Sequence, residues 1–95
     1  MIELGGNIKL AGFKELEPAK LIVVKKMVGT YAKKIAETSP FQELSLTLKG
    51  VHNSNFEIKA NVIIEGQNHH AETTDYNLFF AMDKVLSQIT EMVHK

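Results

Sequence analysis

The sequence contains no cysteine, no long apolar run and no excess of charge of one sign. Without cysteine, the 95-residue chain can form no disulfide framework, use no thiolate nucleophile and build no cysteine-based zinc site. No apolar run approaches the roughly 18 residues that a membrane span needs. The first residues, MIELGGNIKL, have neither the charged nor the apolar region of a secretory signal. We therefore expect a cytoplasmic protein without a membrane segment.

The charge balance argues against one class of protein. Lys plus Arg and Asp plus Glu each number 11, so the formal net charge is zero. A protein that clamps nucleic acid by overall attraction is usually basic, so the balance argues against that class but leaves room for a local basic surface. Apolar residues make up 44% of the chain, which is ordinary for a folded domain, and 95 residues are too few for two cores. We expect one domain over residues 1–95.

The pattern along the chain predicts the element order βαβββα. Residues 2–11 are predicted as a strand in which Gly5-Gly6 marks a bulge or a late start. Further strands are expected at residues 42–51, 55–65 and 68–73. Helices are expected at residues 18–37 and 76–94. Asp75 or Thr74 is the expected N-cap of the second helix, because a side-chain oxygen there can accept a bond from a free backbone N–H.

The apolar faces of these elements predict an α+β fold. Each helix has one apolar side, and each well-formed strand alternates between apolar and polar residues. The economical arrangement is one four-stranded mixed sheet with both helices packed on one face and the other face open to water. The first strand and the strand after the first helix are expected to be parallel, joined by a right-handed crossover. The later strands should form antiparallel hairpins.

No residue pattern predicts catalysis or a metal site. The serines lie in no recognisable nucleophile motif, and Gly5-Gly6 is not followed by a helix at the spacing of a phosphate-binding loop. His70 and Glu72 share one face of a strand and His69 lies on the other, with His52 as a further candidate, whereas zinc needs three or four ligands. We interpret these residues as a polar edge strand, with a pH-sensitive contact as the alternative. We expect no enzyme activity and no cofactor.

The start of the last helix carries a resemblance to a known family. The pattern of that family is an Asp, then an aromatic residue, a small residue, an apolar–Asp pair and a basic residue. The residues that fit it here are Asp75, Tyr76, Ala81, Met82, Asp83 and Lys84. With the stretch NIKLAGFKELEPAKLIVVKKMVGTYAKKI and the element order, the chain resembles the short ribosome hibernation-promoting factors, also called ribosome-associated inhibitors or sigma-54 modulation-like proteins. The resemblance implies a non-catalytic protein that docks on the rRNA of the small ribosomal subunit, represses translation and stores inactive ribosomes.

The resemblance also implies that basic residues on the helices and nearby loops contact RNA. The candidates are Lys20, Lys25, Lys26, Lys33, Lys34 and Lys84, with the loop residues His52 and Asn53 as helpers. The last helix ends with Glu91 and few basic residues, so the first helix is the expected basic face. Lys26 and Lys33 are seven residues apart and point the same way, and several cations on one surface give salt-dependent binding to phosphates. The alternative is an ordinary solvated helix face.

Two adjacent phenylalanines, Phe79 and Phe80, differ by about 100° around the second helix, so only one of them can serve the core well. We assign Phe79 to the core. Phe80 is predicted either as a partner contact, including a stacking platform for a base, or as a cover for the seam between the helices. Ile22, Val23 and Ile63 are further exposed apolar candidates. They favour the alternative function, a protein-interaction or homodimerisation module of the same fold without RNA binding.

Overall fold

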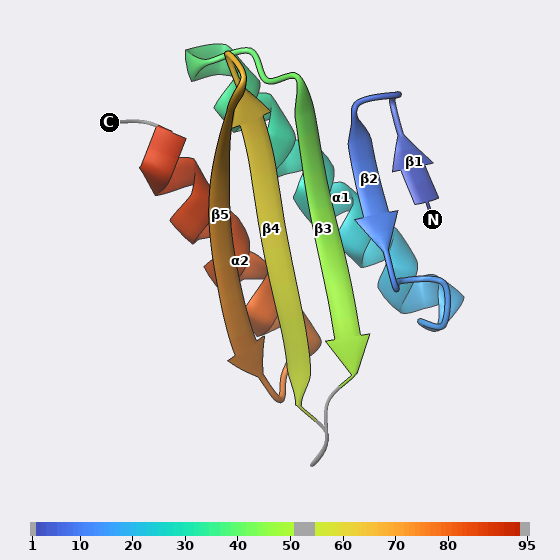
Figure 1. Cartoon of the computed structure of the whole chain (residues 1–95). Helices are drawn as coiled ribbons and strands as arrows, with labels where there is room; N and C mark the ends of the chain where they lie inside the picture. The colour runs from blue at the N-terminus through green and yellow to red at the C-terminus, as the bar shows by residue number, and fades with distance from the viewer. Residues whose placement is uncertain (1, 51–54, 94–95) are drawn as a thin grey trace.

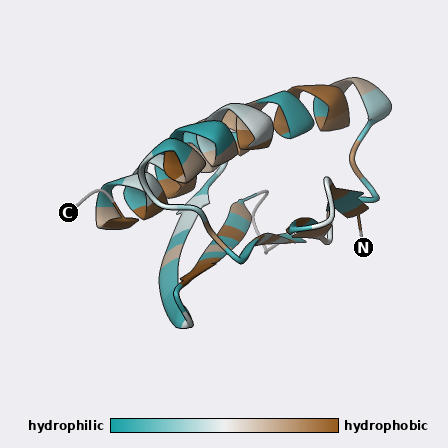
Figure 2. Ribbon diagram, turned by 90° about the horizontal axis from the view of Figure 1, so that it is seen from above, coloured by the Kyte–Doolittle hydropathy of each residue, from teal (hydrophilic) through white to brown (hydrophobic). Residues whose placement is uncertain are grey.

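A computed structural model describes residues 2–50 and 55–93 and shows a mixed sheet with two helices (Figure 1). The strands are β1 (Ile2–Leu4), β2 (Ile8–Ala11), β3 (Glu43–Gly50), β4 (Phe56–Ile64) and β5 (Gln67–Asp75). The helices are α1 (Pro18–Thr38) and α2 (Leu78–Val93). The described strands lie in the order β1-β2-β3-β4-β5. Within this sheet β2 and β3 are parallel and the other neighbours are antiparallel. Both helices cover one face (Figure 2), so the predicted α+β arrangement is confirmed.

The N-terminal segment corrects the prediction of four strands, because the sheet has five. Residues 2–11 form a hairpin of two short strands, in which Leu4 lies opposite Ile8, rather than one strand. Gly5 and Gly6 have φ angles of 67° and 84°, in the left-handed region that glycine adopts without steric cost. They therefore turn the chain back instead of marking a bulge. A strand of three residues is too short for its alternation to be visible in the sequence.

The turn before α1 depends on Gly12, which has a φ of 83°. A Cβ at this position would collide with the carbonyl oxygen of Leu48, so no other residue fits without a backbone shift. Phe13 follows and is fully buried. Pro18 occupies the first turn of α1, where its missing N–H costs nothing. The turn thus fixes where α1 starts, and α1 ends one residue beyond the predicted end.

The start of α2 differs from the prediction, because the helix begins at Leu78 and its N-cap is neither Asp75 nor Thr74. Asn77 caps it: the side-chain oxygen of Asn77 accepts a bond of 3.0 Å from the N–H of Phe80. Asp75 stays in the sheet opposite Phe56, and its carboxylate accepts a bond of 2.9 Å from the N–H of Asn77. The pairing of β5 with β4 thus extends the strand and delays the helix. The predicted end of the helix at His94 lies outside the described residues.

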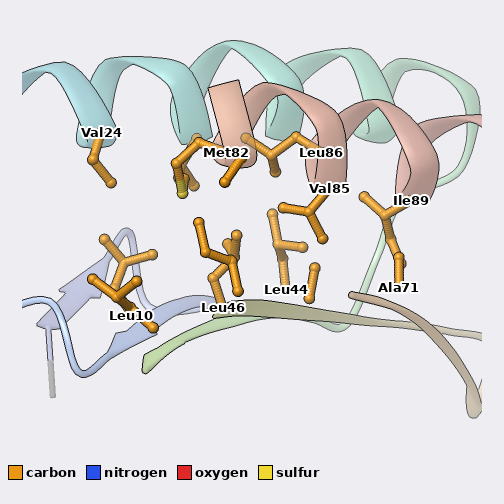
Figure 3. Close-up of a cluster of buried hydrophobic side chains, with 14 of the residues drawn as sticks. Leu10, Val24, Leu44, Leu46, Ala71, Met82, Val85, Leu86 and Ile89 are labelled. Carbon is orange, nitrogen blue, oxygen red and sulfur yellow. The ribbon is translucent and has the colours of Figure 1, made fainter. Parts of the chain in front are cut away.

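The core lies between the helices and the inner face of the sheet (Figure 3). Alternation in β3 and β4 buries the residues predicted to face inward, with Phe56 and Ile64 partly covered at the strand ends. Fully burying one such aliphatic side chain stabilises the fold by about 1.5–3 kcal/mol. The fully buried residues of β3, β4 and α2 include Leu44, Leu46, Ile58, Val62, Met82, Val85, Leu86 and Ile89. This shared core fixes which sides of α1 and α2 point away from the sheet.

Candidate functional site

Positive charge is concentrated on α1. The helix carries five lysines and one glutamate, a formal charge of +4, and the rest of the chain balances it with six lysines against ten acidic residues. All five lysines of α1 are exposed. Over residues 2–50 and 55–93, the lysine that forms an ion pair is Lys9, whose Nζ lies 2.9 Å from Oε1 of Glu43. The charges of α1 are therefore not neutralised by described carboxylates. Neither described helix is both long enough and apolar enough to cross a membrane.

The lysines of α1 are spread around the exposed sides of the helix. The core side of α1 is marked by its buried residues, Val24, Val28, Ala32 and Ile35. At 100° per residue, Lys26 and Lys33 lie within about 20° of each other on the opposite side. Lys34 lies about 100° from Lys33 and Lys25 about 100° from Lys26, in opposite directions around the helix. On this helix geometry Lys26 and Lys33 share one side of α1, and Lys25 and Lys34 lie on its flanks.

Tyr31 closes the seam between α1 and α2, on the side where Lys34 lies. Its hydroxyl donates a bond of 2.7 Å to Oδ1 of Asp83 and lies 3.0 Å from Oγ of Ser87. The Ser87 bond lowers the pKa of Tyr31, but the Asp83 bond, burial and the carboxylate charge together raise the pKa above its ordinary value of 10.0. The Nζ of Lys34 is 5.1 Å from the Tyr31 ring centroid. This contact draws Lys34 to the seam.

Phe80 is only partly covered, at 55% exposure, while Tyr31 closes the seam through its bonds to Asp83 and Ser87. The Nζ of Lys84 lies 5.5 Å from the centroid of the Phe80 ring, and such a contact contributes about 0.5–1 kcal/mol at an exposed site. Phe79 packs against the core, as expected. The ring of Phe80 is therefore available to a partner, and its role as a contact stays a prediction.

Lys20 lies where α1 passes the start of α2. It lines a hollow of about 220 Å³ together with Tyr76 and Phe79. Tyr76 precedes the N-cap of α2 and is 78% exposed. In the sequence Tyr76 is noted only as part of the family pattern and as the first residue of the predicted helix. Its position outside the apolar stripe of α2 is the signal that would have marked it as a surface aromatic residue.

The histidines behave as a polar edge. His70 and Glu72 share the open face of the sheet, with Nε2 of His70 3.3 Å from Oε2 of Glu72, and Nδ1 of His70 is 2.9 Å from Oδ1 of Asn61. His69 lies on the other face of β5. In the part of the chain that the structure describes, no group of three or more His, Asp or Glu residues could hold a metal ion. The predicted helpers His52 and Asn53 lie outside the described residues.

Two solved structures share this fold. The N-terminal domain of Protein Y from Thermus thermophilus superposes with a TM-score of 0.69 and 15% identity, over 92% of each chain. A ribosomal subunit interface protein from Coxiella burnetii superposes with a TM-score of 0.63 and 13% identity, over 92% of this chain and 90% of that one. No family model matches the sequence, and no curated protein matches it significantly. At 13–15% identity, this likeness shows that the chain shares their fold.

Proposed function

We propose that this protein is a ribosome-associated RNA-binding protein that docks on the rRNA of the small subunit and represses translation, as a hibernation-type factor. The observation that carries the proposal is the fold, which the chain shares over 92% of its length with a ribosomal subunit interface protein. The exposed lysines of α1, which no described carboxylate neutralises, support it. The function needs no catalytic group and no cofactor.

In the proposed complex, Lys26 and Lys33 are the main contacts to RNA phosphates. They point the same way on the side of α1 opposite the core. They lie about 10 Å apart along the helix axis, so they reach separate phosphates. Each phosphate that they neutralise releases a counterion, which makes the affinity fall as salt rises. Lys34 and Lys25 flank this pair on its two sides, Lys20 precedes it on the helix, and Lys84 adds a cation on α2. A protein docked in this way occupies subunit surface that mRNA and tRNA need.

Sedimentation with purified small ribosomal subunits tests the proposal. The wild-type protein should comigrate at low salt and separate at high salt. The double variant Lys26→Glu with Lys33→Glu should bind at least about tenfold more weakly, with a salt slope smaller by about 2. The matched control is Lys49→Glu with Lys59→Glu on the sheet, where the two lysines face Glu57 and Glu72 across neighbouring strands. This control makes the same change in net charge and should bind nearly as well as the wild type.

Two results would contradict the proposal. One is no comigration of the wild-type protein at low salt, and the other is an equal loss in the α1 variant and the sheet variant. Circular dichroism checks that each variant is folded. Addition of the wild-type protein to a translation extract should lower protein synthesis in proportion to subunit occupancy, and the α1 variant should not.

A second candidate function is a protein-interaction module of the same fold. The exposure of Ile22 and Val23, at 56% and 42%, favours it, because large aliphatic side chains on the outside of a helix suit a protein partner. Association through these residues would be insensitive to salt. This candidate predicts no comigration with ribosomal subunits, and a dimer or partner contact that is lost in Ile22→Ser and kept in the Lys26→Glu with Lys33→Glu variant.

A further inference from the structure

The aromatic residues of the chain fall into two groups. Five of the seven pack in or against the core: Phe13, Tyr31, Phe41, Phe56 and Phe79. The other two, Tyr76 and Phe80, are 78% and 55% exposed. Both lie at the start of α2, on either side of its N-cap Asn77 and only four residues apart in the chain. The other aromatic rings are buried or partly buried against the core, so two exposed rings so close in the chain call for a function.

Cations accompany both rings. The Nζ of Lys84 lies 5.5 Å from the centroid of the Phe80 ring. Lys20 reaches the same end of the molecule from α1 and lines, with Tyr76, the hollow of about 220 Å³. Asp75 and Asp83 also lie in this region, where Asp75 accepts a bond from the N–H of Asn77 and Asp83 accepts one from the hydroxyl of Tyr31. The surface therefore offers two π faces with a lysine beside each ring.

We propose that the start of α2 is a stacking platform for unpaired nucleobases, formed by Phe80 and Tyr76, with Lys84 and Lys20 beside the phosphates. Stacking needs a base whose face is free, which single-stranded RNA offers and a duplex does not. Protein-bound bases stack on aromatic rings with little dependence on sequence. The inference rests on the proposed function and deepens it: the RNA that reaches α2 is a single-stranded segment, while the lysines of α1 contact phosphates of either form.

Binding of short RNA oligonucleotides to the isolated protein tests this without ribosomes. Anisotropy of labelled oligoadenylate and of a labelled duplex of equal length gives the two affinities. The wild type should prefer the single strand. Phe80→Leu keeps an apolar side chain but removes the ring, and should weaken single-strand binding about 5- to 100-fold, because stacking is worth about 1–3 kcal/mol per base. Phe80→Tyr, which keeps a ring, should bind like the wild type, and neither change should alter duplex binding.

Tyrosine fluorescence gives a second readout, because the chain has no tryptophan and two tyrosines. In a Tyr31→Phe background Tyr76 is the sole tyrosine, and a base that stacks on it should quench its emission. Oligoadenylate should quench this signal, and a duplex should not.

Equal affinity for the two RNA forms, or wild-type single-strand affinity in Phe80→Leu, would overturn the stacking platform. So would a Phe80→Ala variant that loses subunit binding while Phe80→Leu keeps it, since that pattern marks an apolar protein contact. These failures leave ribosome docking intact if the wild type still comigrates with subunits. Loss of comigration in the wild type, with stacking still seen on oligonucleotides, would instead overturn the docking proposal alone.

Discussion

The two helices cover the same face of the same sheet, but they use their surfaces differently. α1 has 21 residues and buries four of them, whereas α2 has 16 residues and buries six. α1 carries five lysines on its exposed sides, whereas α2 carries one lysine within its described length. The difference indicates that α2 anchors the sheet and that α1, held by a narrow apolar stripe, presents charge. Three pairs of substitutions test this division of roles, from the largest expected change in stability to the smallest.

The largest change should come from the core side of α2. Leu86 is fully buried, so Leu86→Ala removes packing and leaves a cavity, and should lower the free energy of unfolding by about 3 kcal/mol. Ile22 on α1 is the matched aliphatic residue at 56% exposure, and Ile22→Ala should change the same quantity by less than about 0.5 kcal/mol. Urea denaturation followed by circular dichroism measures both. Similar losses at the two positions would show that α1 anchors the fold as strongly as α2.

The N-terminal ends of the two helices should also differ in their contribution to stability, and the larger loss should again come from α2. Asn77→Ala removes the side-chain cap of α2 and should cost about 1 kcal/mol, because the N–H of Phe80 loses its partner. Glu17 holds the corresponding position at α1 but makes no side-chain cap bond, so Glu17→Ala should cost almost nothing. Thermal melting gives the change in Tm of each variant relative to the wild type. A larger decrease in Tm for Glu17→Ala than for Asn77→Ala would contradict the conclusion that α2 is the helix that anchors the sheet.

The smallest change concerns the seam where the helices meet. Tyr31→Phe removes the bonds to Asp83 and Ser87 and should cost about 0.5–1 kcal/mol at neutral pH, since the site is partly solvated. The pKa of Tyr31 is raised in the folded state, so folding favours the protonated phenol. The advantage of the wild type over Tyr31→Phe should be complete below pH 10.0 and decline as pH rises through the raised pKa.

Urea titrations of wild type and variant at pH 7, 9 and 10.5 measure this decline. Tyr76→Phe is the control, because Tyr76 is 78% exposed and its substitution should leave stability unchanged at every pH. A constant difference between wild type and Tyr31→Phe across the range would show that the hydroxyl does not join the helices through a bond to the Asp83 carboxylate.

Local patterns in the sequence predicted most of the fold. The leucines of β3 and the helical repeat from Val24 to Ile35 are long enough to show their period, and both elements were placed within a residue or two. The N-terminal hairpin was missed because β1 has three residues and cannot display alternation. The cap of α2 was missed because the choice between Asp75 and Asn77 depends on how far β5 stays paired with β4.

The candidate site was predictable in its residue types and less so in its arrangement. The helix that carries Lys26 and Lys33 was predicted correctly, and their common side follows from helix geometry alone. The contact of Tyr31 with Asp83 joins residues 52 positions apart in the chain, and no local pattern contains such a pairing. For the same reason the meeting of Lys20 with Tyr76 beside one hollow became visible only in the folded chain.

The charge of α1 has a consequence for how the protein would approach a polyanion. A helix at +4 and a remainder at −4 make this neutral molecule an electric dipole. A polyanion exerts little net pull on it from a distance but a strong torque nearby, within roughly the 8 Å screening length of physiological salt. We expect the molecule to rotate as it arrives, so that α1 leads and the acidic remainder trails. Neutrality thus limits long-range capture by any polyanion, while the separated charges select the orientation of each encounter.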